Sequence, residues 1–138
     1  VKIFLIIRGI CCLVPNMKDM SENIHGISIV DRFLEHSRVY YFYHGGEEKI
    51  FISSSDWMVR NLHFRIEVAF PIYSEKLKKE IKDILELQLK DNVKARSIEY
   101  QHVNEYINRD TDKKNRSQIE TYKYYKAILK AMNETDEK

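Results

Sequence analysis

The sequence has few cysteines, a nearly balanced charge and no long hydrophobic run. Its two cysteines, Cys11 and Cys12, are adjacent in an apolar stretch. Adjacent cysteines rarely form a disulfide or a metal site, so we interpret them as small buried hydrophobic side chains in a reducing compartment. The formal net charge of +2 provides no general polybasic surface for nucleic acid. No apolar stretch approaches the roughly 20 residues that a membrane-spanning helix needs.

The histidines also lack the spacing of a metal site. His44, His63 and His102 are not grouped with other histidines, cysteines or carboxylates at ligand-like intervals, so the sequence predicts no metal ion in this chain. The composition is that of a globular domain, with 43% hydrophobic and 32% charged residues, and 138 residues suffice for one domain with one core. The chain starts at Val1, inside an expected strand and without an initiator methionine, which indicates a piece of a longer protein.

The apolar periodicity predicts strands first and helices last. The expected strands cover residues 2–13, 38–43, 49–53 and 64–72, and the expected helices cover residues 27–35, 74–93 and 117–132, the last preceded by a polar stretch at residues 109–115. The glycines after Tyr43 predict a hairpin, and Ser74 is the expected N-cap of the long helix. The charged tail at residues 133–138 is expected to fray. This order predicts an α/β fold, a mixed β-sheet with flanking helices.

A histidine at the end of one apolar segment is the main candidate for chemistry. His36 directly precedes a β-rich run, and a small-polar turn with Asp56 and Arg60 follows about twenty residues later. Histidine exchanges protons near neutral pH, and arginine, serine and asparagine donate hydrogen bonds to phosphate oxygens. The pattern indicates a phosphoryl-transfer site. Two alternatives stay open from the residues alone: His36 caps a helix, and Arg8 pairs with a carboxylate such as Asp31.

Five segments in this order resemble the C-terminal domain of bacterial polyphosphate kinase, the ATP:polyphosphate phosphotransferase. They are residues 8–13 (RGICCL), 21–24 (SENI), 27–42, 51–61 and 91–96 (DNVKAR). The resemblance runs from Val1 to about Arg96 and continues weakly through the last helix. It implies that residues 1–138 form a single phospholipase D-like domain, the last of four in the family, with a C-terminal helix and tail over about 117–138.

The resemblance also implies roles for particular residues. Arg8 and His36 would contact the phosphates of ATP, with His36 as the catalytic residue, while Arg38 and Arg60 are candidates for extending a phosphate channel. The phosphorylated histidine and the Mg²⁺ ligands would lie in the preceding domain. ATP and inorganic polyphosphate would be the substrates, the preceding domains the partners, and the full-length protein a homo-oligomer. The expected location is cytoplasmic, with peripheral membrane association as an option.

A more distant resemblance to the phospholipase D motif is incomplete. The motif's H-x-K reads His36-Ser37-Arg38 here, and Tyr43 stands where an acidic residue is expected, while Glu67 falls at the later acidic position. These departures argue against phosphodiesterase activity, which stays an alternative beside a non-catalytic polyanion-binding module.

His25 stands where relatives are expected to have arginine. Trp57 is expected to anchor the core, and the serines before Asp56 are expected to shape their turn through side-chain to backbone bonds.

Overall fold

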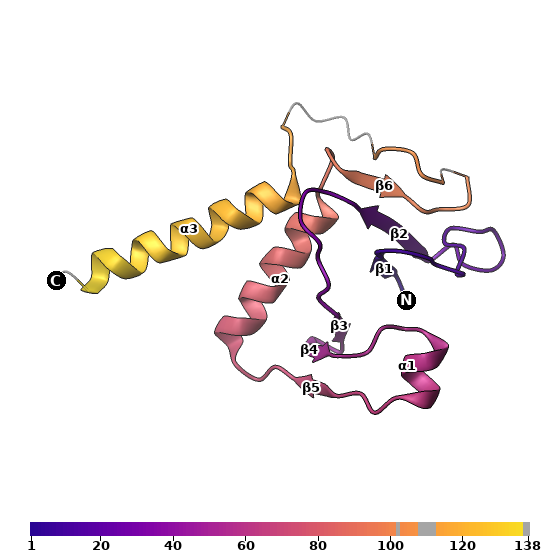
Figure 1. Cartoon of the computed structure of the whole chain (residues 1–138), viewed down its shortest axis with the longest axis horizontal. Helices are drawn as coiled ribbons and strands as arrows, with labels where there is room; N and C mark the ends of the chain where they lie inside the picture. Colours follow the sequence, from indigo (N-terminus) through magenta and orange to yellow (C-terminus); the bar gives the residue numbers. More distant parts are fainter. Residues whose placement is uncertain (102, 108–112, 137–138) are drawn as a thin grey trace. The chain divides into compact units, whose positions relative to one another are not determined.

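A computed structural model describes residues 1–101, 103–107 and 113–136. The chain divides into two compact units, one formed by Val1–Leu34 with Ile84–Lys138 and the other by Glu35–Asp83. The helices and strands of both are labelled in Figure 1. The α/β class is confirmed, but the strands form two three-stranded sheets instead of one. The assignment of residues 1–138 to a single domain stays a prediction.

The first unit contains a mixed sheet. Its strands are β1 (Ile3–Ile6), β2 (Ile24–Ile29) and β6 (Ala95–Ser97), with β2 in the centre. β1 and β2 are parallel, and β2 and β6 are antiparallel. Ile29 and Ala95 are paired in register and both are buried, so the core of this unit lies at the junction of β2 and β6.

Three predictions for the first unit differ from the structure. Cys11 is partly exposed and Cys12 is exposed, so the prediction that both are buried is wrong. The strand expected over residues 2–13 ends at Ile6, because Gly9 has a φ of 93° that turns the chain out of its extended path. The helix expected over residues 27–35 is wrong, since residues 27–29 belong to β2 and the following residues form no helix. Phe33 and Leu34 are 64% and 75% exposed, so the expected apolar helix face is not buried.

The second unit contains an antiparallel sheet of β3 (Val39–His44), β4 (Glu47–Ser53) and β5 (Ala69–Pro71). The predicted hairpin is confirmed. Gly45 and Gly46 connect its strands with φ values of 57° and 87°, the left-handed conformations that a tight two-residue hairpin turn requires. The turn brings residues that precede β3 to the same end of the hairpin as residues that follow β4.

The segment after β4 was only partly predicted. A short helix, α1 (Val59–Phe64), stands where no helix was expected, and the strand expected over residues 64–72 is reduced to β5. Trp57 is 76% exposed, so its expected role as a core anchor is wrong. Ile50 of β4 is the buried apolar side chain of this unit's sheet.

Two longer helices complete the chain. α2 (Glu75–Leu89) begins in the second unit and ends in the first, and the Ser74 hydroxyl accepts a hydrogen bond from the Leu77 amide at 3.5 Å, as expected of an N-cap. α2 ends before the predicted residue 93. α3 (Ser117–Asp136) continues past the predicted end at residue 132, into the tail for which fraying stays a prediction. Residues 109–112 and 137–138 lie outside the described residues.

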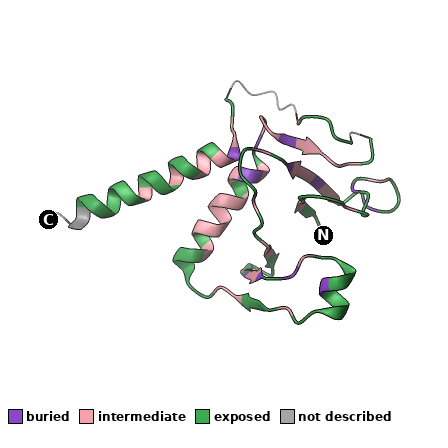
Figure 2. Cartoon of the chain, in the orientation of Figure 1, coloured by how far each residue is buried: buried purple, intermediate pink, exposed green. Residues whose placement is uncertain are grey.

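A buried carboxylate joins the end of α2 to β6 and α3. Buried positions are sparse along the chain and several are polar (Figure 2). Asp91 is fully buried, and its carboxylate accepts backbone N–H hydrogen bonds from Val93, Lys94, Ala95 and Ser117 at 2.7–3.0 Å. Burial raises the pKa of Asp91, but the backbone hydrogen bonds outweigh burial and leave this pKa below its usual value.

Candidate functional site

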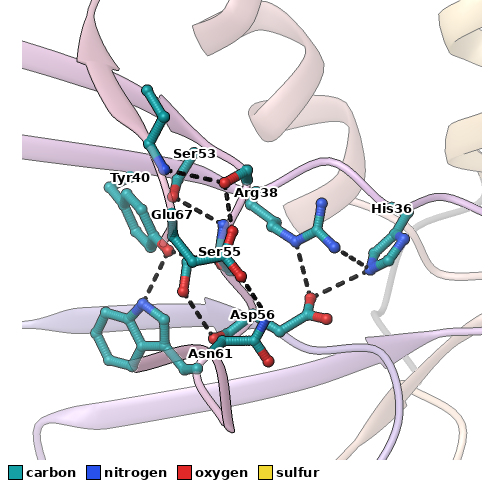
Figure 3. Close-up of polar contacts among 11 residues, drawn as sticks. His36, Arg38, Tyr40, Ser53, Ser55, Asp56, Asn61 and Glu67 are labelled. Carbon is teal, nitrogen blue, oxygen red and sulfur yellow. Dashed lines mark hydrogen bonds and ion pairs between the residues drawn. The ribbon is translucent and has the colours of Figure 1, made fainter. Parts of the chain in front are cut away.

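Three side chains of the second unit meet where the hairpin strands begin and end (Figure 3). His36 and Arg38 precede β3, and Asp56 follows β4. Asp56 Oδ1 accepts a hydrogen bond from Arg38 Nε at 2.8 Å and lies 3.1 Å from His36 Nε2. Arg38 Nη2 lies 2.7 Å from the same His36 nitrogen. The structure therefore brings together two residues singled out from the sequence and a third that was assigned to a turn.

Charge is balanced within this cluster. The Arg38 hydrogen bond lowers the pKa of Asp56 to about 2, with a smaller contribution from His36 that adds to it and a burial contribution that opposes it. The same bond raises the pKa of Arg38. The side chains of His36, Arg38 and Asp56 are 44%, 23% and 29% exposed, so the site is open to a solute while its ion pair is partly desolvated.

The turn after β4 is held by its own side chains, as predicted. The Ser53 hydroxyl accepts a hydrogen bond from the Ser55 amide at 3.0 Å, and the Ser55 hydroxyl donates to the Asp56 carbonyl at 3.0 Å. The indole Nε1 of Trp57 donates to the Tyr40 hydroxyl at 2.8 Å. These bonds fix the backbone that carries Asp56.

A second polar network surrounds Glu67. Its carboxylate accepts hydrogen bonds from the Ser54 hydroxyl and from Asn61 Nδ2, the latter at 2.7 Å, and these bonds lower the pKa of Glu67. Asn61 is buried, and its Oδ1 has no hydrogen-bond partner among the described residues. The sequence places Glu67 at an acidic motif position and Asn61 in the turn whose arginine, serine and asparagine side chains can donate to phosphate. It does not predict the short helix α1, in which Asn61 is buried and bonded to Glu67.

Arg8 lies just after β1 in the first unit and is exposed. The alternative in which it pairs with Asp31 is wrong, because Asp31 binds the guanidinium of Arg116 at 2.6 and 2.8 Å.

Arg60 is exposed in α1. His25 is 3.1 Å from Glu99, which also accepts a hydrogen bond from Asn16. The roles of Arg8, His36, Arg38 and Arg60 toward phosphate stay predictions.

No group of three or more histidine, cysteine, aspartate or glutamate side chains within the described ranges is arranged to hold a metal ion. Among the helices that the structure describes, none is long and apolar enough to cross a bilayer.

Comparison with known proteins shows that the chain is similar to phosphotransferases of one family. The family model "Polyphosphate kinase C-terminal domain 2" matches residues 1–118. The polyphosphate kinase of Escherichia coli K12 is 46% identical over 128 residues, which are 93% of this chain and 19% of that protein. The polyphosphate kinase of Vibrio cholerae is 52% identical over 130 residues, 94% of this chain and 18% of that protein.

A solved structure agrees with these relatives. The crystal structure of polyphosphate kinase from Porphyromonas gingivalis matches with a TM-score of 0.90 and 49% identity, over 95% of this chain and 20% of that one. The chain belongs to the polyphosphate kinase family, as the C-terminal domain named by the family model. It spans about a fifth of the length of these relatives.

Proposed function

We propose that this chain contributes phosphate-binding residues to a polyphosphate kinase, which transfers the terminal phosphate of ATP reversibly onto inorganic polyphosphate. The products of the forward reaction are ADP and a polyphosphate that is longer by one phosphate. The observation that carries this proposal is the open His36–Arg38–Asp56 cluster in a chain that is 46–52% identical to named polyphosphate kinases.

Phosphoryl transfer depends on positioning and on neutralising the charge of the phosphate oxygens, more than on covalent chemistry by the protein. Arg8 is an exposed, permanently charged fork that can donate two hydrogen bonds to one phosphate. His36 adds an imidazole N–H that can donate a hydrogen bond to a phosphate oxygen. Arg38 and Arg60 are proposed to extend the path of positive charge for polyphosphate. Each of these residues would neutralise charge that accumulates during the transfer.

The remaining parts of the reaction belong to the rest of the full-length protein. The phosphorylated histidine that receives the phosphate, and the ligands of Mg²⁺, are proposed to lie in the preceding domain, as the family resemblance implies. The preceding domains are the proposed partners of this chain, in a homo-oligomer located in the cytoplasm, with peripheral membrane association as an option. The isolated chain is expected to be inactive because it lacks the nucleophile.

The test uses the full-length protein and compares each candidate with a matched variant. Arg8→Ala and His36→Ala should each lower kcat for polyphosphate synthesis by about 10²–10³-fold, the usual loss when one donor to a developing charge is removed. Arg32→Ala and His44→Ala alter exposed side chains of the same types and should leave kcat within about twofold. Initial rates of ADP release measure all four variants.

Three results would contradict the proposal. Full activity of both Arg8→Ala and His36→Ala would remove these residues from the reaction. Steeply salt-dependent binding of RNA without preference for polyphosphate would favour the polyanion-binding module. Hydrolysis of a generic phosphodiester by the purified protein, lost in His36→Ala, would favour a phospholipase D-like hydrolase.

A further inference from the structure

The two ring nitrogens of His36 have different surroundings. Nε2 is engaged by the protein, 3.1 Å from Asp56 Oδ1 and 2.7 Å from Arg38 Nη2. Nδ1 makes neither contact, and in the part of the chain that the structure describes it has no hydrogen-bond partner. Since the His36 side chain is 44% exposed, Nδ1 is the ring nitrogen left for a ligand.

Asp56 is the fixed member of this cluster. Its Oδ1 is shared by Arg38 Nε and His36 Nε2. Its backbone carbonyl accepts hydrogen bonds from the Ser55 hydroxyl at 3.0 Å and from the Met58 amide at 2.8 Å, which hold the turn in place. The Arg38 hydrogen bond keeps the pKa of Asp56 at about 2, so this carboxylate is ionised at every pH at which the protein is expected to act.

The contacts of Nε2 determine whether Nδ1 carries a proton. Arg38 can only donate, so neutral His36 accepts its N–H at Nε2 and carries its own proton on Nδ1. When His36 is protonated, both ring nitrogens carry a proton. Nε2–H then donates to Asp56 Oδ1, and the contact between Arg38 Nη2 and Nε2 has to give way because two donors do not pair. In both protonation states Nδ1–H is a donor that points away from the Asp56–Arg38 pair.

We propose that Asp56 is a positioning residue that, together with Arg38, holds Nε2 of His36 and so presents Nδ1–H to a phosphate oxygen of the substrate. This inference rests on the proposed function and adds the residue and the atom through which the site would act. Asp56 itself does not touch the phosphate, because a carboxylate beside a phosphate oxygen would repel it.

The first experiment is a double-mutant cycle in the full-length protein. Asp56→Ala should lower kcat by about 10²-fold, the cost expected when a reacting group is misplaced by about 1 Å, and should change the KM for ATP much less. Because Asp56 acts through His36, adding Asp56→Ala to His36→Ala should cost no further activity. Asp56→Glu keeps the carboxylate and should recover part of kcat. Glu48→Gln removes a carboxylate whose described partners are Lys82 and Tyr41, and it should leave kcat unchanged.

The second experiment identifies the nitrogen. The side-chain amide nitrogen of asparagine occupies roughly the place of histidine Nδ1, whereas that of glutamine reaches the place of Nε2. We expect His36→Asn to retain at least about tenfold more kcat than His36→Gln, in line with the strength of a charge-assisted hydrogen bond.

The outcomes separate this inference from the proposed function. If His36→Ala keeps full activity, the proposed function fails. If His36→Ala is impaired but Asp56→Ala is active, or the two losses multiply in the double variant, the positioning role of Asp56 is wrong and the proposed function stands. If His36→Gln is the more active of the two amide variants, Nε2 meets the phosphate and the assignment of Nδ1 is overturned.

Discussion

At the residue scale, Asp91 makes the largest set of buried hydrogen bonds in the first unit. Asp91→Ala would leave four backbone N–H groups without their acceptor, and a buried donor without a partner costs about 1–3 kcal/mol. We expect the free energy of unfolding to fall by about 3 kcal/mol or more, measured by urea denaturation followed by circular dichroism.

A carboxylate on the surface of α2 provides the control for Asp91. Glu86→Gln removes the exposed ion pair of Glu86 with Lys90, and such pairs contribute about 0–1 kcal/mol. Equal losses in Asp91→Ala and Glu86→Gln would show that the hydrogen bonds of Asp91 do not hold α2, β6 and α3 together.

The candidate site shows what residue patterns can and cannot predict. His36 and Arg38 are identifiable from their residue types and from the family resemblance. Asp56 was placed in a turn, because its contact with His36 depends on hairpin register, in which Val39 pairs with Ile52. Register is decided by turn geometry and by side-chain packing across the strands, neither of which is visible in the spacing of residues 36 and 56.

At the element scale, the length of a helix or strand and the strength of its sequence pattern decide whether it could be predicted. The hairpin and the two long helices have glycines, caps and sustained periodicity, and each was located. β6 and α1 have three and six residues, too few for a period to be measured. The spacing of Ile27, Val30 and Phe33 fits a helix. Residues 27–29 belong to β2 instead, where hydrogen bonds to β1 and β6 on either side satisfy the backbone N–H and C=O groups.

Gly26 in β2 has no room for a side chain. A Cβ at this position would lie 2.6 Å from Ile98 Cγ1 and 2.9 Å from Pro15 Cγ. Gly26→Ala should therefore lower the free energy of unfolding by about 1–3 kcal/mol, the usual cost of overpacking. The melting temperature measured by calorimetry should fall accordingly.

A double-mutant cycle shows whether this close contact is the cause. Ile98→Val removes the Cδ1 atom that would lie 2.8 Å from the new Cβ, so Gly26→Ala should cost less in an Ile98→Val background than in the parent chain. If the two costs simply add, the loss arises from the backbone of β2 and not from crowding against Ile98.

At the scale of the whole molecule, stability is expected to depend on carboxylates in both units. In the first unit, the hydrogen bonds of Arg116 lower the pKa of Asp31, and the backbone hydrogen bonds lower that of Asp91 against the opposing effect of burial. In the second unit, Arg38 lowers the pKa of Asp56 to about 2. Acid should therefore weaken both units.

Whether stability rises or falls with pH follows from the direction of these pKa shifts. A folded-state pKa below the unfolded value of 3.8 means that the ionised carboxylate stabilises the folded chain. That stabilisation is complete above the unfolded pKa and is lost as the pH falls through the folded one. We expect the melting temperature to be nearly constant from about pH 7 to pH 5 and to fall increasingly below about pH 4.

Single variants identify which carboxylate causes the fall of the melting temperature in acid. Asp31→Asn should lower the melting temperature at neutral pH, because the ion pair with Arg116 is lost. It should also make the decline of the melting temperature in acid shallower, because the variant has no Asp31 carboxylate left to be protonated. Asp19→Asn provides the comparison, since Asp19 is exposed and its backbone amide, not its carboxylate, is bonded to Glu22. A decline in Asp31→Asn as steep as in the parent chain would mean that the Asp31–Arg116 pair contributes nothing to acid sensitivity. In that case the remaining dependence would come from the other carboxylates with a lowered pKa, which are Asp91, Asp56, Glu48 and Glu67, and variants of these residues are then compared over the same pH range.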